Sequence, residues 1–163
     1  MRGALSLGAV LLALALRAAG QDAVDPAQGL LDSAAQWEAQ HRPDLARLAL
    51  QKLLLSKPGD PEASRRLGLL EIHSGNIAEA QQILAAVQAR NPQSAAAQEL
   101  AVTLRLETRD RLKLATVRRL VETGRQAEAA QAMRELLPDG PPPGPYGEEY
   151  RRVVGDRGPA PTS

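Results

Sequence analysis

Side chains that could carry out catalysis or hold a metal are scarce in this chain. It has no Cys, which excludes disulfides, thiolate zinc sites and Cys nucleophiles, and its two His residues, His41 and His73, are too few for a His-rich metal cluster. No pair of carboxylates stands in a recognisable acid–base motif, and no Gly-rich loop follows a predicted strand. We therefore expect no enzyme activity, no metal site and no cofactor.

The densest charge lies between residues 105 and 125. Seven basic residues fall there against three acidic ones, and Arg111 and Arg118 are seven positions apart, so they share one face of a helix. Such a run is most often a solvated helix surface. The alternative is an electropositive wall that attracts an acidic peptide or an anionic cell-wall polymer. Nucleic acid is not expected as a partner, because residues 21–163 carry 18 basic and 19 acidic side chains.

The elements that position these residues are predicted to be helices. Of the 163 residues, 29 are Ala and 26 are Leu, whereas Val and Ile together number 11 and Phe is absent. Ala and Leu favour helices, and the branched and aromatic residues that suit a sheet are rare. The composition predicts an all-α fold.

The first twenty residues are predicted to be a cleavable signal peptide. Arg2 supplies a positive start, residues 5–16 form an apolar run, and small residues end at Gly20. The run is shorter than the ~20 residues that a membrane-spanning helix needs. We expect the mature chain to be exported to the periplasm, with residues 21–137 as its folded domain.

A repeat of 34 residues runs through the middle of the chain. Small residues allow helices to approach closely, larger apolar residues at helical spacing fill the groove between helices, and Pro ends each unit. The matched pairs at this spacing are Ala34 and Gly68, Ala46 and Ala80, Leu50 and Leu84, Leu53 and Val87, and Pro58 and Pro92. The pattern resembles the tetratricopeptide repeat, a helix–turn–helix of 34 residues, and predicts a helical solenoid.

The turns of these units are predicted from their capping residues. Asp44 is expected to cap a helix over residues 45–56, Gly75 to adopt the left-handed conformation that ends a helix, and Asn76 to form a capping box with Glu79. These turns would fold each pair of helices into a hairpin.

The third unit is out of phase with the first two. Its residues Gly124, Ala129, Met133 and Leu136 match Gly75, Ala80, Leu84 and Val87 at a spacing of 49, which is 34 plus 15. We expect the extra chain after residue 94 to form one unpaired helix, followed by a hairpin of helices at about 110–123 and 127–137. An odd helix is expected to change the direction in which the repeats stack, as a hinge would.

The composition changes after residue 137. Seven of the 12 prolines lie in residues 138–163, so this part is predicted to be an extended Pro/Gly-rich tail. Within it, residues 146–154 have the pattern of the start of a further helix.

Two stretches are more specific than the repeat itself. Residues 124–138 run into a Pro/Gly segment at 140–144 and then Glu149-Tyr150, and Trp37-Glu38 is followed by DLAR at 44–47 and ALQK at 49–52. Together they resemble the amino-terminal repeats of the cellulose synthase operon protein C family. The resemblance implies a non-catalytic periplasmic scaffold that couples a glucan synthase in the inner membrane to an export channel in the outer one. Family members continue through many more repeats to a β-barrel porin. This sequence has neither, so we expect that it is not itself the channel.

Repeat stacks usually bind partners along the concave surface built by the first helix of each unit. We expect the partners to be other proteins of a cellulose synthesis and export complex, with glucan or a cell-wall polymer as the alternative. Trp37, the one aromatic residue within the repeats, is expected to be core rather than a sugar-stacking platform. The alternative functions are a generic periplasmic repeat adaptor in envelope assembly and a weak polysaccharide-binding module. Aligning the units places ten residues on the predicted surface: Leu31, Glu38, Arg65, Leu69, Ile72, His73, Arg111, Leu114, Arg118 and Val121.

Overall fold

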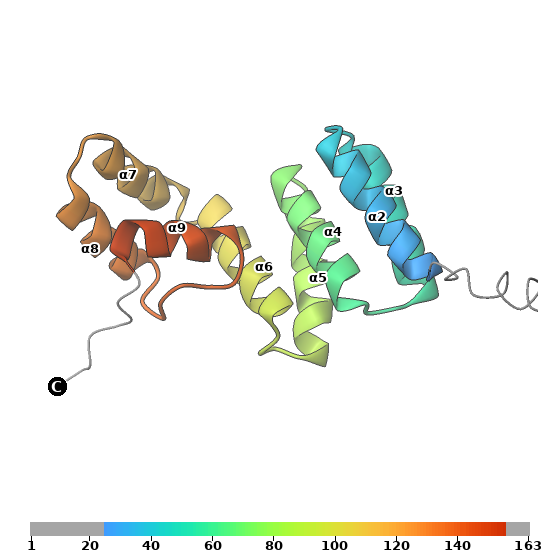
Figure 1. Ribbon diagram of the computed structural model, residues 1–163. Coiled ribbons are helices and arrows are strands. Elements are labelled where there is room, and N and C mark those ends of the chain that lie inside the picture. Colours follow the sequence, from blue (N-terminus) through green and yellow to red (C-terminus); the bar gives the residue numbers. More distant parts are fainter. Residues whose placement is uncertain (1–24, 156–163) are drawn as a thin grey trace, which may run out of the picture.

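The computed structural model describes residues 25–155 and is built from helices (Figure 1). Eight helices and no strand occur in this range, so the all-α prediction is confirmed. The predicted signal peptide, residues 1–20, lies outside the described residues. The helices are α2 (Pro26–Ala39), α3 (Pro43–Ser56), α4 (Pro61–His73), α5 (Ile77–Arg90), α6 (Ala95–Glu107), α7 (Arg111–Glu122), α8 (Gln126–Leu136) and α9 (Pro145–Val154).

The first four helices form two hairpins, α2 with α3 and α4 with α5, which stack side by side (Figure 1). Most of the helical residues paired at the spacing of 34 lie in their interior, because these positions face the neighbouring helices, whereas Pro58 and Pro92 are exposed just after the ends of α3 and α5. The buried members are Ala34, Ala46, Leu50, Leu53, Gly68, Ala80 and Val87.

Gly68 shows why one of these positions needs a small residue. A Cβ atom there would lie 2.6 Å from Cδ2 of Leu100 on α6 and 3.4 Å from Cγ2 of Ile83 on α5. Leu100 is only 1% exposed, so it has little room to move. Gly68 therefore permits the close approach of α4 to both neighbouring helices.

Each of the three hairpins turns at a residue in the left-handed backbone conformation. Gly75 has φ = +80° and Gly124 has φ = +73°, as the sequence predicts, but the first turn uses His41 at φ = +56°. In all three turns the following residue donates its backbone N–H to the carbonyl five positions earlier, for example from Arg42 to Trp37 at 2.8 Å. This conformation costs a residue other than Gly about 1–2 kcal/mol. The turn therefore holds His41 in a strained backbone.

The capping roles predicted for two residues are wrong. Helix α3 begins at Pro43, whose fixed φ suits the first helical position, so Asp44 lies inside the first turn and binds Arg42 at 3.0 Å. Asn76 stands at the N-cap of α5, but its side chain makes no capping bond. Its Nδ2 instead donates to Oε2 of Glu71 at 2.6 Å. A cap would use Oδ1 of Asn76 as an acceptor, whereas this bond uses Nδ2 as a donor to a charged carboxylate, which makes it a strong hydrogen bond.

Helix α6 is the unpaired helix predicted between the second and third hairpins. It packs against α4 and α5, whereas its contact with α7 is slight, and in Figure 1 it lies between the two groups of helices. In the register of 34 residues, Leu114 takes the position that Ala46 and Ala80 hold in the first two hairpins. This larger residue stands where a closely packed hairpin needs a small one, so α7 does not fold back along α6.

Helices α7 and α8 form the third hairpin, with ends within one residue of those predicted. The Pro/Gly-rich segment after α8 is irregular, and the further helix predicted at residues 146–154 is α9. Helix α9 packs on α8 and adds Tyr146, Tyr150 and Val153 to a buried cluster. The packed core thus continues past residue 137, where the composition changes.

The core of the described residues is divided into three apolar clusters along the stack. The first joins α2, α3 and α4 around Leu50 and Leu67. The second joins α4, α5 and α6 around Leu100, and the third joins α6 to α7, α8 and α9 around Met133. Each cluster therefore connects only helices that are near one another in the sequence.

Candidate partner-binding groove

A cavity of about 650 Å³ lies between α2 and α4, beside the turn into α3; we name it the α2–α4 groove. Glu38, Arg65, Leu69 and His73, which were predicted to face a partner, all line it. The structure therefore brings four of the ten predicted residues together. The groove also includes His41, Pro43, Arg66, Leu70 and Ser74.

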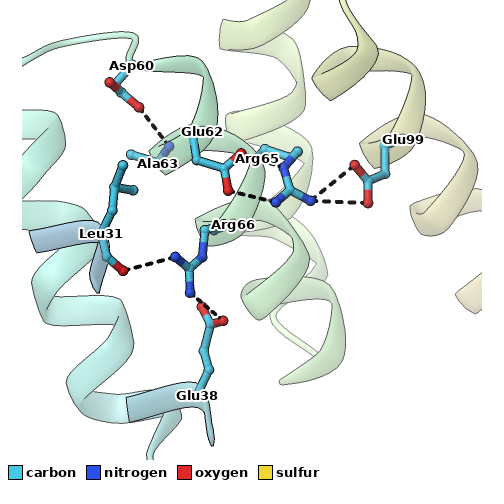
Figure 2. A network of polar contacts seen from close by, with 8 residues as sticks. All are labelled: Leu31, Glu38, Asp60, Glu62, Ala63, Arg65, Arg66 and Glu99. Carbon is cyan, nitrogen blue, oxygen red and sulfur yellow. Dashed lines mark hydrogen bonds and ion pairs between the residues drawn. The ribbon is translucent and has the colours of Figure 1, made fainter. Parts of the chain in front are cut away.

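Arg66 connects the two helices that form the groove. Its Nη2 donates to Oε2 of Glu38 at 2.7 Å and its Nη1 donates to the carbonyl of Leu31 at 3.0 Å (Figure 2). The Arg66 side chain is 14% exposed, so these charge-assisted bonds are shielded from water. They fix the position of α2 relative to α4.

Arg65, the preceding residue on α4, connects the groove to α6. Its Nε and Nη2 both donate to Glu62 at 2.8 Å, and its Nη1 reaches Oε2 of Glu99 at 3.2 Å (Figure 2). The hydrogen bonds with Glu62 and the charges of Glu62 and Glu99 raise the pKa of Arg65 against the opposing effect of burial. Arg65 therefore stays charged and holds both carboxylates.

A third polar contact joins α3 to α4. Glu71 is 3% exposed and accepts from Nη2 of Arg47 at 3.0 Å and from Nδ2 of Asn76 at 2.6 Å. Burial by itself raises the pKa of Glu71, but the hydrogen bonds from Arg47 and Asn76 and the charge of Arg47 outweigh it and leave the pKa below its ordinary value of 4.5. The buried carboxylate is thus ionised and fully paired.

The other six predicted residues do not extend the groove. Ile72 and Leu114 are 5% and 2% exposed and belong to the core, and Leu31 is half-buried against the first cluster. Val121 is 38% exposed on α7. The ten residues therefore do not form a single surface.

A second cavity, of about 400 Å³, lies along α7 and contains three of the predicted residues, Arg111, Leu114 and Arg118. Its remaining lining residues are Glu107, Ala115, Arg119 and Glu122. Because both charge signs line it, this cavity does not present a uniformly positive wall.

Four of the seven basic residues in the stretch at residues 105–125 form ion pairs. Arg118 on α7 binds Glu149 on α9 through two hydrogen bonds of 2.8 and 2.9 Å. Three more of the seven basic residues form ion pairs, Arg105 and Lys113 with Asp110 and Arg125 with Glu128. This pairing favours the interpretation of the stretch as a solvated helix surface.

Five residues of the groove were not among those predicted: His41, Pro43, Arg66, Leu70 and Ser74. His41 takes a turn position where the other hairpins have Gly, and nothing in the sequence marks Arg66 as a link to α2. The Arg65–Glu99 pair did carry a signal, because its two members are 34 residues apart. Trp37 is half-buried on α2 and lies outside the three apolar clusters.

Within residues 25–155, no group of three or more His, Asp or Glu side chains is placed to hold a metal ion. In the same part of the chain, no helix combines the length and apolar character needed to cross a membrane. The groove offers apolar surface from Leu69 and Leu70 beside hydrogen-bonding groups from the Arg and His side chains. Such a lining is suited to binding another molecule.

Antiparallel hairpins at a 34-residue spacing, small residues at the helix contacts and a left-handed turn residue define the class: the described chain is a tetratricopeptide-repeat solenoid. A family model described as tetratricopeptide repeat matches residues 38–103.

The chain is similar, more specifically, to cellulose synthase operon protein C, which confirms the predicted resemblance. It is 32% identical to that protein from Pseudomonas fluorescens SBW25 over 90% of this chain, and 34% identical to that from Escherichia coli K12 over 78%. It spans only 12% and 11% of the length of these relatives. A crystal structure of the flexible tandem repeat domain from the C subunit of bacterial cellulose synthase matches with a TM-score of 0.66 and 30% identity, covering 80% of this chain and 54% of that one.

Proposed function

We propose that this chain is a non-catalytic repeat scaffold that assists bacterial cellulose synthesis and export by binding other proteins of that machinery in the periplasm. The observation that carries the proposal is the similarity to cellulose synthase operon protein C along most of the chain, combined with the α2–α4 groove. The tetratricopeptide-repeat fold supports a holding role, because such stacks present extended binding surfaces.

The groove supports binding to a protein segment because ion pairs hold together the helices that form it. Arg66 fixes α2 to α4 and Arg47 fixes α3 to α4 through buried or half-buried ion pairs. A surface that is already ordered loses little conformational entropy on association, so more of the contact energy appears as affinity. Leu69 and Leu70 provide the apolar contact, and His41 and His73 provide hydrogen-bonding groups at its rim.

The proposed location rests on residues 1–20. Their positive start, apolar run and small residues before position 21 are those of a secretory signal. Cell fractionation and amino-terminal sequencing of the native protein test this directly: a periplasmic chain that begins at Gln21 is expected, and an uncleaved chain retained in the cytoplasm would contradict it.

Site-specific photo-crosslinking in the native bacterium tests the binding role. A photoreactive residue in place of Leu69, inside the groove, should capture a protein of the cellulose machinery. The same residue in place of Gln51, which is exposed on α3, is the matched control and should capture none. Crosslinks from Leu69 to proteins of general envelope assembly would contradict the proposal and favour the function of a generic periplasmic adaptor.

A titration with cello-oligosaccharides separates protein binding from glucan binding. Trp37 is the only Trp in the chain, so its fluorescence reports on the repeats without labelling. We expect no saturable change. A saturable change would instead support a polysaccharide-binding module, and isothermal titration calorimetry of Trp37→Leu, which needs no fluorophore, would show whether the indole makes the contact.

A further inference from the structure

Leu106 is the fully buried side chain of α6 in the third apolar cluster, and the partly buried Val102 packs against the same cluster. The contact of α6 with α7 is slight, and Gln98, Val102 and Arg105 of α6 line a cavity together with the segment 137–142. An apolar contact has no preferred direction. Leu106 and Val102 therefore hold the two parts together, whereas directional bonds are needed to fix the angle between them.

Arg105, the neighbour of Leu106, makes directional contacts to both helices of the third hairpin. Its Nη1 donates to Oδ2 of Asp110 at 2.9 Å, just before α7, and to the carbonyl of Leu136 at 3.2 Å, at the end of α8. Carbonyls at the end of a helix carry partial negative charge, so a cation is favoured there. One guanidinium thus ties α6 to the start of one helix and the end of the next.

Glu107, which follows Leu106 in the sequence, makes a second polar contact. The hydroxyl of Tyr146, on α9, donates to Oε1 of Glu107. Burial and the nearby Glu107 raise the pKa of Tyr146, so the hydroxyl keeps its proton and remains a donor. Nearer the amino-terminal end of α6, the Glu99 side chain lies against Gly144 and leaves no room for a Cβ atom on Gly144.

We propose that Arg105 and Glu107 form a polar clamp that sets the orientation of α7, α8 and α9 about Leu106. The contacts of Arg105 and Glu107 reach different helices. A rotation of the carboxyl-terminal helices about Leu106 would therefore break both contacts. Since Glu99 also binds Arg65, the same helix carries a connection from the α2–α4 groove to the start of α9.

Pulsed electron-electron double resonance on the mature chain tests the clamp. The chain has no Cys, so Ala85→Cys on α5 and Arg134→Cys on α8, both exposed, give two unique spin-label sites on either side of α6. The parent should give one narrow distance peak. Arg105→Gln and Tyr146→Phe should each lose that peak in favour of a broad distribution, while far-ultraviolet circular dichroism retains the parent's helix content.

Arg125→Gln is the matched control. It also removes an Arg–carboxylate pair, but one that lies within the third hairpin, between Arg125 and Glu128. The control should keep the narrow peak. The proposal is overturned if both clamp variants keep the narrow peak, or if Arg125→Gln broadens it equally. If Arg105→Gln does not fold, Tyr146→Phe, which removes a single oxygen atom, decides the outcome alone.

Discussion

Two glycines inside helices should respond in opposite ways to replacement by Ala. A Cβ atom at Gly29 on α2 would meet nothing within 4 Å, whereas one at Gly68 on α4 would lie 2.6 Å from Leu100. Ala is favoured over Gly inside a helix by about 1 kcal/mol. Gly29→Ala should therefore raise the free energy of unfolding by about that amount.

Gly68→Ala has the same helical advantage but must displace Leu100, which is almost fully buried. Overpacking a core costs about 1–3 kcal/mol, so the net change should lie between about zero and a loss of 2 kcal/mol. The two variants should thus differ by about 1–3 kcal/mol in the free energy of unfolding.

Urea denaturation followed by far-ultraviolet circular dichroism measures the difference. Leu100→Ala completes a double-mutant cycle, because by itself it leaves a cavity that costs about 2–5 kcal/mol. In the Gly68→Ala background it should cost less, since the added methyl group fills part of that space. The reasoning is refuted if Gly68→Ala stabilises the chain as much as Gly29→Ala, or if the Gly68 and Leu100 changes are additive.

Three further changes test other contacts. His41→Gly removes the strain of the left-handed turn, offset in part by the greater freedom of Gly in the unfolded chain, and should raise the free energy of unfolding by about 0.5–1 kcal/mol in urea titrations. Asp60→Ala removes the N-cap of α4 and should lower it by about 1 kcal/mol in the same assay. Arg47→Gln leaves the buried Glu71 carboxylate without its cation and should cost about 3 kcal/mol at neutral pH. Because the pKa of Glu71 is lowered in the folded chain, the stability it contributes is full above its ordinary value of 4.5 and is lost as the pH falls through the folded-state value. The stability gap between the parent and Arg47→Gln should therefore narrow on acidification, and an unchanged gap would contradict this account.

The sequence predicted the hairpins well because their signals are local and repeated. Apolar residues at helical spacing and the 34-residue register identify which faces are buried, and Ala80 and Val87 are buried as that register requires. The unpaired helix was predicted from a change in register. Its physical cause, the bulk of Leu114 at a position that is Ala in the hairpins, became evident only when the contacts of α6 were known.

The predictions that were wrong concern side chains whose contacts are decided by the folded chain rather than by the local sequence. Asn76 has the residue type and position of an N-cap, yet Glu71 lies close enough in the folded chain to bind it instead. His41 lacks the usual signature of a left-handed turn, because the surrounding hairpin imposes the conformation on it. The groove was predicted only in part. The repeat register places residues on a face of their helix, but it does not identify the neighbouring helix that forms the other side of the groove, which is α2 where Arg66 binds Glu38.

The division of the core into three clusters has a mechanical consequence. A tensile load applied to the two ends of the described chain passes through the clusters one after another, because no cluster spans the whole stack. Such a series arrangement yields at its weakest junction, where α6 meets α7, while the hairpins on either side stay folded. The solenoid is thus expected to lengthen in steps under force, and to recover its shape when the force is removed.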